Sequence, residues 1–179
     1  LAAALLFSAH AALGATVDPA TGILNYGGAV PQNNNLKFEV GPAVGQVRVI
    51  NNFNGTVESF SGVRGINYVA GAGDDFIEFD INASQSLALT TNTGAGPAFF
   101  KIQWKSPAGA LSAASSLSMG SGGGDVNVEL DFESEVHTST FGWTTNFGGG
   151  NKLLKSIIEF KQGTVNATKN VNFANLGGG

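Results

Sequence analysis

Hydrophobic and polar residues alternate along most of the chain from residue 47 onward. Ile77, Phe79 and Ile81 alternate with Glu78 and Asp80. A period of two is typical of a strand that buries one face and exposes the other. The same pattern recurs at 100–104, 126–132, 154–160 and 165–173. It predicts an all-β fold.

One turn signal is local and specific. Asn54-Gly55 separates two strand-like segments at 47–50 and 56–60. Both residues tolerate positive φ angles, so the dipeptide predicts a tight hairpin. A short polar link at 82–85 also favours antiparallel pairing between 77–81 and 87–89.

A weak internal repeat follows the glycine clusters. The last glycines of four clusters, at positions 73, 96, 124 and 150, are spaced by 23, 28 and 26 residues, within the range of solenoid repeats. The fourth residue after each is apolar, and so is the eighth: Ile77, Phe100, Val128 and Leu154, then Ile81, Trp104, Phe132 and Ile158. In a stacked parallel fold these residues would form columns.

Two architectures therefore agree with the pattern. We predict an antiparallel β-sandwich of jelly-roll type for two reasons. The Asn-Gly hairpin is antiparallel, and residues 125–133 require a strand with one solvent-exposed face. The alternative is a right-handed parallel β-solenoid. A meander with Gly-rich loops would produce the same spacing as the solenoid.

The N-terminal segment predicts export. Residues 1–7 are apolar, and Ala9 and Ala11 match an A-x-A cleavage site, so we interpret 1–15 as a truncated signal peptide. A buried N-terminal helix is the alternative. Residues 16–179 form one predicted β-rich domain, with truncation also predicted after Gly179. The apolar run is shorter than the ~20 residues of a membrane-spanning helix, so we expect a secreted or surface location.

Composition excludes several functions. The 179 residues include 9 Lys and Arg, 13 Asp and Glu and no Cys, with a net charge of -4. The sequence has no basic stripe that could neutralise phosphates, so we do not expect it to bind nucleic acid. The lack of cysteine excludes disulfides, thiolate zinc sites and cysteine nucleophiles.

A stretch of about 40 residues resembles known modules. Gly73-Asp74-Asp75, the alternating segment 76–81, then 86–89, and then 100–104 with Pro107 and Gly109 are similar to secreted bacterial jelly-roll modules. These include pre-peptidase C-terminal domains and carbohydrate-binding modules. The resemblance implies a β-sandwich that accompanies exported enzymes or surface proteins, sometimes with a structural calcium ion.

Acidic residues gather at 74–80 and at 125–135. Calcium takes six to eight oxygen ligands, and carboxylates beside Gly-rich loops supply them. We predict one calcium ion near Asp74 and Asp75, with Asp80 as a further ligand. The alternative is that these carboxylates form a solvated strand face.

Three aromatic residues are candidates for sugar binding. Trp143 lies in a Gly- and Thr-rich segment, where an exposed ring can stack on a sugar. Tyr68 and Phe147 are the other two candidates for an exposed ring. Packing beneath a loop is the alternative.

Catalytic signals are weak. Outside the predicted signal peptide the one histidine is His137, and no Gly-x-Ser-x-Gly motif is present. We predict an exported, non-catalytic binding or structural module, with a surface glycan or self-association through sheet edges as its candidate partners. A self-associating filament, matrix or adhesin subunit is the first alternative, and a polysaccharide-active enzyme is the second.

Overall fold

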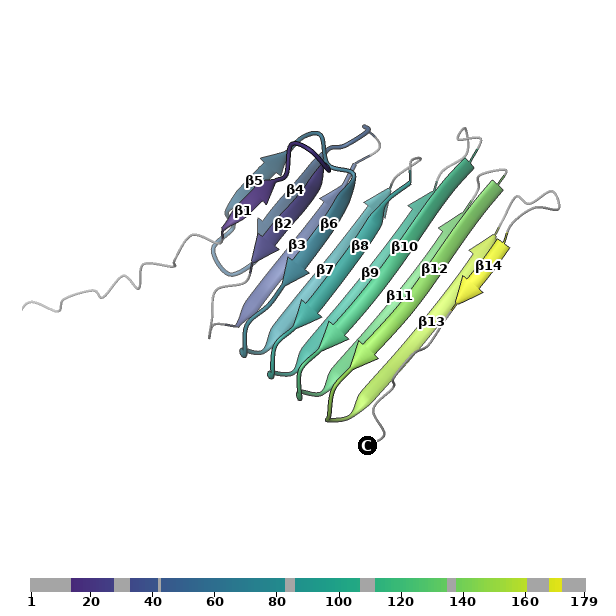
Figure 1. Ribbon diagram of the computed structural model, residues 1–179. Coiled ribbons are helices and arrows are strands. Elements are labelled where there is room, and N and C mark those ends of the chain that lie inside the picture. The colour runs from purple at the N-terminus through teal and green to yellow at the C-terminus, as the bar shows by residue number, and fades with distance from the viewer. Residues whose placement is uncertain are drawn as a thin grey trace, which may run out of the picture.

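The computed structural model describes residues 14–27, 33–41, 43–82, 86–106, 112–134, 138–160 and 168–171. These residues form two facing seven-stranded sheets (Figure 1). Sheet A has the order β1-β2-β6-β8-β10-β12-β14, and sheet B has the order β13-β11-β9-β7-β3-β4-β5. The all-β prediction is confirmed.

The strand bounds follow. Sheet A contains β1 (Ala15–Val17), β2 (Ile23–Gly27), β6 (Gly65–Val69), β8 (Ala88–Thr93), β10 (Ser112–Ser121), β12 (Thr138–Phe147) and β14 (Thr168–Val171). Sheet B contains β3 (Asn34–Val40), β4 (Val47–Asn51), β5 (Val57–Phe60), β7 (Asp75–Asn82), β9 (Ala98–Ser106), β11 (Val126–Ser134) and β13 (Lys152–Phe160).

From β6 onward the chain alternates between the sheets. Even-numbered strands extend sheet A and odd-numbered strands extend sheet B, so each winding adds one strand to each sheet. All pairs within this part are parallel. Because parallel neighbours need a crossover, the opposite sheet serves as the crossover of each winding.

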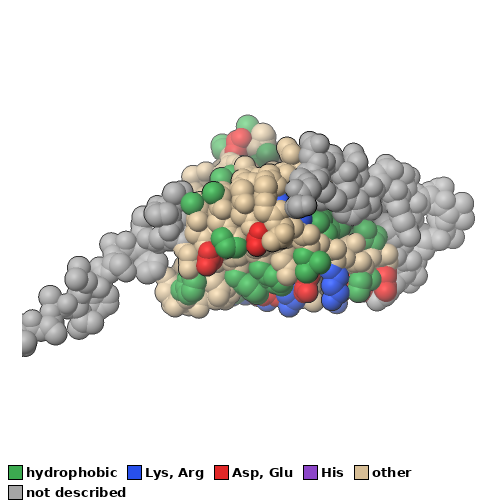
Figure 2. Space-filling view, turned by 90° about the horizontal axis from the view of Figure 1, so that it is seen from below, with side chains coloured by type: hydrophobic (Ala, Val, Ile, Leu, Met, Phe, Trp, Pro, Cys, Tyr) green, Lys and Arg blue, Asp and Glu red, His purple; other side chains and the backbone are tan. Residues whose placement is uncertain are grey.

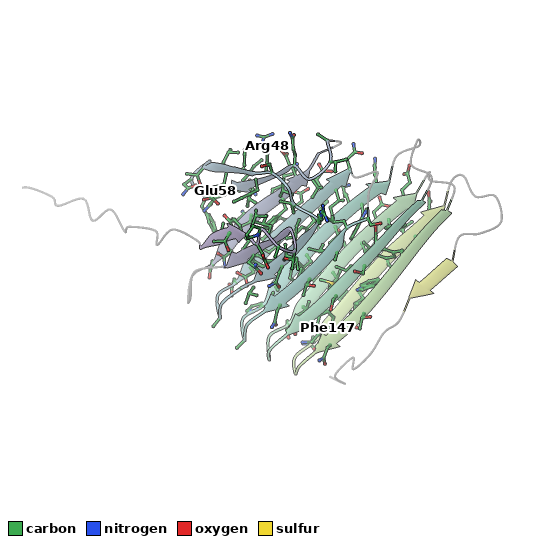
Figure 3. All side chains as sticks on the ribbon, turned by 45° about the horizontal axis from the view of Figure 1, so that its top comes forward. Arg48, Glu58 and Phe147 are labelled. Carbon is green, nitrogen blue, oxygen red and sulfur yellow. The ribbon has the colours of Figure 1, made fainter. Side chains whose placement is uncertain are left out.

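The N-terminal part is paired differently. β1 pairs antiparallel with β2, and β3, β4 and β5 form an antiparallel meander. The hairpin predicted at Asn54-Gly55 is confirmed: it joins β4 to β5, and Gly55 has a φ of 71°. Tyr26 on β2 ties the two sheets together here, because its hydroxyl donates to Glu58 Oε2 at 2.8 Å. Glu58 and Arg48 project from these N-terminal strands (Figure 3).

The antiparallel pairing predicted for the rest of the chain, beyond β1–β5, is wrong. Segments 77–81 and 87–89 belong to β7 and β8, which lie in different sheets. An alternating pattern reports which face is buried and carries no information about strand direction, so the sequence could not distinguish the two pairings. The Asn-Gly hairpin was specific only for its own two strands.

The repeat columns predicted from the glycine spacing are in register. Ile77, Phe100, Val128 and Leu154 are direct neighbours across β7, β9, β11 and β13, and so are the residues four positions later. The glycines stack as well. A Cβ on Gly94, Gly122 or Gly148 would strike the carbonyl of Gly71, Gly94 or Gly122 respectively. Only glycine lets these corners of the windings approach so closely.

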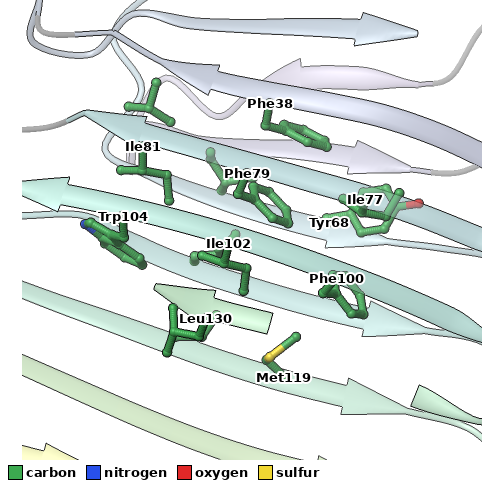
Figure 4. Close-up of a cluster of buried hydrophobic side chains, with 14 of the residues drawn as sticks. Phe38, Tyr68, Ile77, Phe79, Ile81, Phe100, Ile102, Trp104, Met119 and Leu130 are labelled. Atoms are coloured by element: carbon green, nitrogen blue, oxygen red, sulfur yellow. The ribbon is translucent and has the colours of Figure 1, made fainter. Parts of the chain in front are cut away.

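The core lies between the sheets and receives side chains from both. Its largest fully buried members include Trp104, Trp143, Phe79, Phe100 and Phe132. Figure 4 shows Tyr68 and Met119 from sheet A among Phe79, Phe100 and Ile102 from sheet B. Within the described ranges, no helix has the length and hydrophobicity to cross a membrane.

Candidate functional site

A groove of about 490 Å³ crosses the outer face of sheet B where its strands begin. It follows the corners that precede β7, β9, β11 and β13 and extends to Phe53 in the β4–β5 turn. Figure 2 shows hydrophobic side chains gathered on this side of the molecule, with acidic side chains beside them. We call this feature the groove.

Parallel register arranges the groove lining in three columns. The corner column holds the residue before each strand, the next column points inward, and the third column points outward. The corner column is Asn33, Asp74, Pro97, Asp125 and Asn151; the inner one is Asn34, Asp75, Ala98, Val126 and Lys152; the outer one is Asn35, Phe76, Phe99, Asn127 and Leu153.

The outer column contains a rigid aromatic pair. Phe76 and Phe99 stack with ring centroids 5.0 Å apart and planes 11° from parallel. Phe76 is nevertheless 41% exposed, and Leu153 further along is 63% exposed. Each ring covers one face of the other, so a ligand meets their outer edges and remaining faces. Because stacking already holds the two rings in place, binding of a ligand to this apolar strip costs little further conformational entropy of the protein.

The corner column is held by side-chain caps on backbone groups. The N–H of Asp74 donates to Asn33 Oδ1 at 3.0 Å, and the N–H of Asn151 donates to Asp125 Oδ1 at 2.8 Å. Backbone bonds continue the ladder, as in Asp75 N–H to the Pro97 carbonyl at 2.9 Å. The polar groups of this column are therefore fixed relative to the aromatic strip.

Asp75 is a buried carboxylate at the floor of the groove. Its side chain is 4% exposed, and its Oδ1 accepts from Asn34 Nδ2 at 2.7 Å. Its Oδ2 is buried with no hydrogen-bond partner among the described residues. Desolvation raises the pKa of Asp75 from 3.8 to about 6, the bonds from Asn34 oppose this rise, and the charge of Asp74 adds to it.

Tyr68 lies near this carboxylate inside the core. Burial raises the pKa of its hydroxyl above the usual range, and the charge of Asp75 raises it further. The hydroxyl oxygen is itself buried without a partner among the described residues. Two buried polar atoms without partners among the described residues, Asp75 Oδ2 and the Tyr68 hydroxyl, therefore interact electrostatically in the core.

The rings predicted to bind sugar are in the core. Tyr68 and Trp143 are 0% exposed and Phe147 is 3% exposed, so the prediction that they present a face to a ligand is wrong. Trp143 is in register with Leu117 on β10, which places it on the inner phase of sheet A. Phe147, labelled in Figure 3, lies close to the corners at the end of β12.

The predicted calcium ligands do not converge. Asp74 and Asp75 line the groove, but Asp80 is five residues further along β7 on the opposite face of the strand. Asp80 faces Lys37 instead, with 3.5 Å between Oδ2 and Nζ. The described residues contain no group of three or more potential metal ligands. His137 and the predicted signal peptide up to residue 13 lie outside the described residues.

Sequence reasoning missed the aromatic pair. Phe76, Phe99, Asn127 and Leu153 each come three residues after the last glycine of a cluster. The apolar fourth and eighth positions of the repeat predict the core columns, and the third position is not apolar in every repeat, because Asn127 occupies it once. That position directly precedes the core column, and successive side chains of a strand point to opposite faces, which is the signal for an outward column.

The groove is the candidate binding site because of its chemistry and not because of its volume. A hollow of about 580 Å³ beside Arg64 and Leu87 is larger. Its lining contains no carboxylate and no aromatic ring. The groove combines an apolar strip with fixed polar groups and a pKa-shifted carboxylate, which is the combination expected of a binding site.

Comparison with known proteins identifies no relative of this chain. No protein-family model matches the chain, and no curated protein or solved structure matches it. The resemblance to jelly-roll modules therefore stays a prediction.

Proposed function

We propose that the chain is an exported, non-catalytic β-domain that binds an extracellular polysaccharide in the groove. The stacked and partly exposed Phe76–Phe99 pair beside Asp74 and Asp125 carries the proposal. Sugar rings have apolar faces and polar edges, so they suit a surface that sets aromatic carbon next to carboxylate and amide groups. The groove is the part of sheet B where these two chemistries are aligned.

We infer that β6–β14 form a parallel β-solenoid that serves as the scaffold of this surface. The alternation of strands between the sheets and the in-register columns support this inference. In such a scaffold each winding repeats the same surface positions, so an outward column becomes a linear array. A linear array suits a polymer better than it suits a small ligand.

The test compares removal of exposed apolar side chains inside and outside the groove. Phe76→Ala with Phe99→Ala should weaken binding in a polysaccharide pull-down by about tenfold, because both apolar contacts are lost. Val69→Ala is the matched control, since Val69 is 45% exposed on the outer face of sheet A. Thermal unfolding of all variants checks that the fold is retained.

Unchanged binding by the double variant would remove the groove from the proposal. Catalysis is tested in the same experiment, because a buried carboxyl group with a raised pKa is also what a general acid requires. Release of new reducing ends from the bound polysaccharide, lost in Asp75→Asn, would show an enzyme. We expect binding without product release.

Self-association is the second candidate. β13 is the last strand of sheet B among the described residues, and Leu153 and Ile157 on it are 63% and 50% exposed. An edge strand with exposed apolar residues favours pairing with another copy. Light scattering over a concentration series tests this: association that Ile157→Lys abolishes would support it.

A further inference from the structure

The groove has an unequal charge distribution. Three carboxylates line it, Asp74, Asp75 and Asp125, against one ammonium group, Lys152. That ammonium group is occupied: Lys152 Nζ donates to the Gly124 carbonyl at 2.6 Å and to the Gly149 carbonyl. It also lies 6.0 Å above the ring of Phe147. The charge available to a ligand is therefore negative.

Asp75 shows that this negative charge is built into the floor. Its Oδ2 is buried, lacks a partner among the described residues, and belongs to a residue that lines the groove. A buried carboxylate oxygen without a donor is costly for the free protein. A cationic or hydrogen-bond-donating ligand nearby would lower that cost.

The groove also has a defined length. Its columns cross β3, β7, β9, β11 and β13, which are four inter-strand steps of ~4.8 Å each, or roughly 19 Å. A pyranose chain linked through opposite sides of its rings advances by about one such step per sugar. An extended peptide advances ~3.3 Å per residue, so neither one nor two residues match the step.

We propose that the groove binds a linear polysaccharide with free amino groups, one sugar per strand, with its amines beside Asp74 and Asp125 and its rings against Phe76 and Phe99. This inference rests on the proposed function and adds to it the charge and the length of the ligand. The amine supplies the positive charge that the acidic lining complements. The aromatic strip fixes the direction of the chain across the strands.

Calorimetric titration with three oligosaccharide series tests the proposal at low salt and at a pH just above 6, where Asp75 keeps its charge. The series are β-1,4-linked glucosamine oligomers, their N-acetylated counterparts and β-1,4-linked glucose oligomers, each from the disaccharide to the hexasaccharide. We expect the amine series to bind about three- to tenfold more tightly than the other two. Affinity should rise with length until the chain spans the groove, and added salt should weaken only the amine series.

Charge-neutral variants locate the effect. Asp74→Asn with Asp125→Asn should bring the amine series down to the affinity of the neutral glucose series. Asparagine keeps an oxygen that can accept the Asn151 N–H, so the corner cap survives. Asp80→Asn with Asp131→Asn is the control, because it removes two charges from the outer part of sheet B that lies away from the groove. The control should retain the amine preference.

The outcomes separate the two proposals. No binding by any series would overturn the proposed function itself. Equal affinity for all three series, or saturation at the disaccharide, would overturn the charge or length inference while leaving sugar binding intact. Tighter binding of a lysine-rich peptide than of any sugar series would also overturn it.

Discussion

The outer faces of the two sheets differ in composition although their inner faces are alike. In sheet A, strands β1, β2, β6, β8, β10 and β12 contain no charged residue. Every strand of sheet B contains at least one. One outward column of sheet A is Asn25, Asn67, Thr90, Ser118 and Thr144, whereas one of sheet B is Lys37, Glu78, Lys101, Glu129 and Lys155.

The difference between the sheets shows which positions of the alternating pattern are required for packing of the core. Both sheets contribute buried rings to one core, so the inner positions satisfy the same packing requirement. The outer positions are free of that requirement, and of the strands just compared those of sheet B use them for charge and for an exposed aromatic pair. In the column of alternating charge each charged side chain has opposite charges beside it on the neighbouring strands, which favours this pairing.

Removing an inner-face tryptophan from either sheet should have the largest effect. Trp104 in sheet B and Trp143 in sheet A are both 0% exposed. Truncation of each to alanine should lower the free energy of unfolding by about 3 to 5 kcal/mol through lost burial and a residual cavity. Urea unfolding measures both variants. A large loss for Trp104→Ala beside no loss for Trp143→Ala would contradict the common core.

The corners that join the sheets should tolerate substitution unequally. A Cβ on Gly124 would strike the carbonyl of Gly96, while a Cβ on Gly123 has no atom within 4 Å. Gly124→Ala should therefore lower the free energy of unfolding by about 3 kcal/mol, since backbone must move. Gly123→Ala is the control and should be close to neutral. Equal unfolding midpoints for the two variants would contradict the stacked corners.

Replacing the buried acid of the groove should raise stability. The pKa of Asp75 is about 6 in the folded protein against 3.8 ordinarily. Between these values the folded state holds a proton that the unfolded chain has released, so stability falls as pH rises through this window. Asp75→Asn should remove that fall and gain on the order of 2 to 3 kcal/mol above pH 6. Parallel stability curves for the two proteins between pH 4 and 7 would exclude this role.

The same contrast between the sheets explains how far the sequence alone could lead. In sheet B the outward charges make the alternation plain, so β7, β9, β11 and β13 were predicted with their core columns. In β10 and β12 of sheet A the described outward residues are Thr, Ser, Asn and Gly, which differ little from small buried ones, so these two strands gave no clear signal. Pairing direction was beyond reach, because it is set by the crossover and not by alternation.

The candidate site was predictable only in part. Asp74 and Asp75 were singled out and do line the groove. Asp80 should have been separated from Asp75 by parity, since residues five apart on a strand face opposite sides. Trp143 was misjudged because Gly and Thr neighbours suggest a loop, whereas its place in a strand register determines its burial. Asn34 entered the site through pairing with β7, which is a long-range contact.

The smallest predicted effect tests the outer faces directly. Lys101 lies between Glu78 and Glu129 in register, with its Nζ 3.5 Å from Glu78 Oε1. Lys101→Glu should cost about 1 kcal/mol, because an attraction between partly exposed groups becomes a repulsion on both sides. Thr90→Glu is the matched change in sheet A, where the neighbours Asn67 and Ser118 are neutral, and it should change stability by less than about 0.5 kcal/mol.

Salt determines whether charge is the cause. The penalty for Lys101→Glu should shrink as salt screens the carboxylates, while the value for Thr90→Glu should stay level. Equal effects for both variants at low salt would mean that the alternating column does not stabilise sheet B. In that case the charges on this face would serve solubility and ligand binding alone, and the register of the windings would rest on the stacked glycine corners and the core columns.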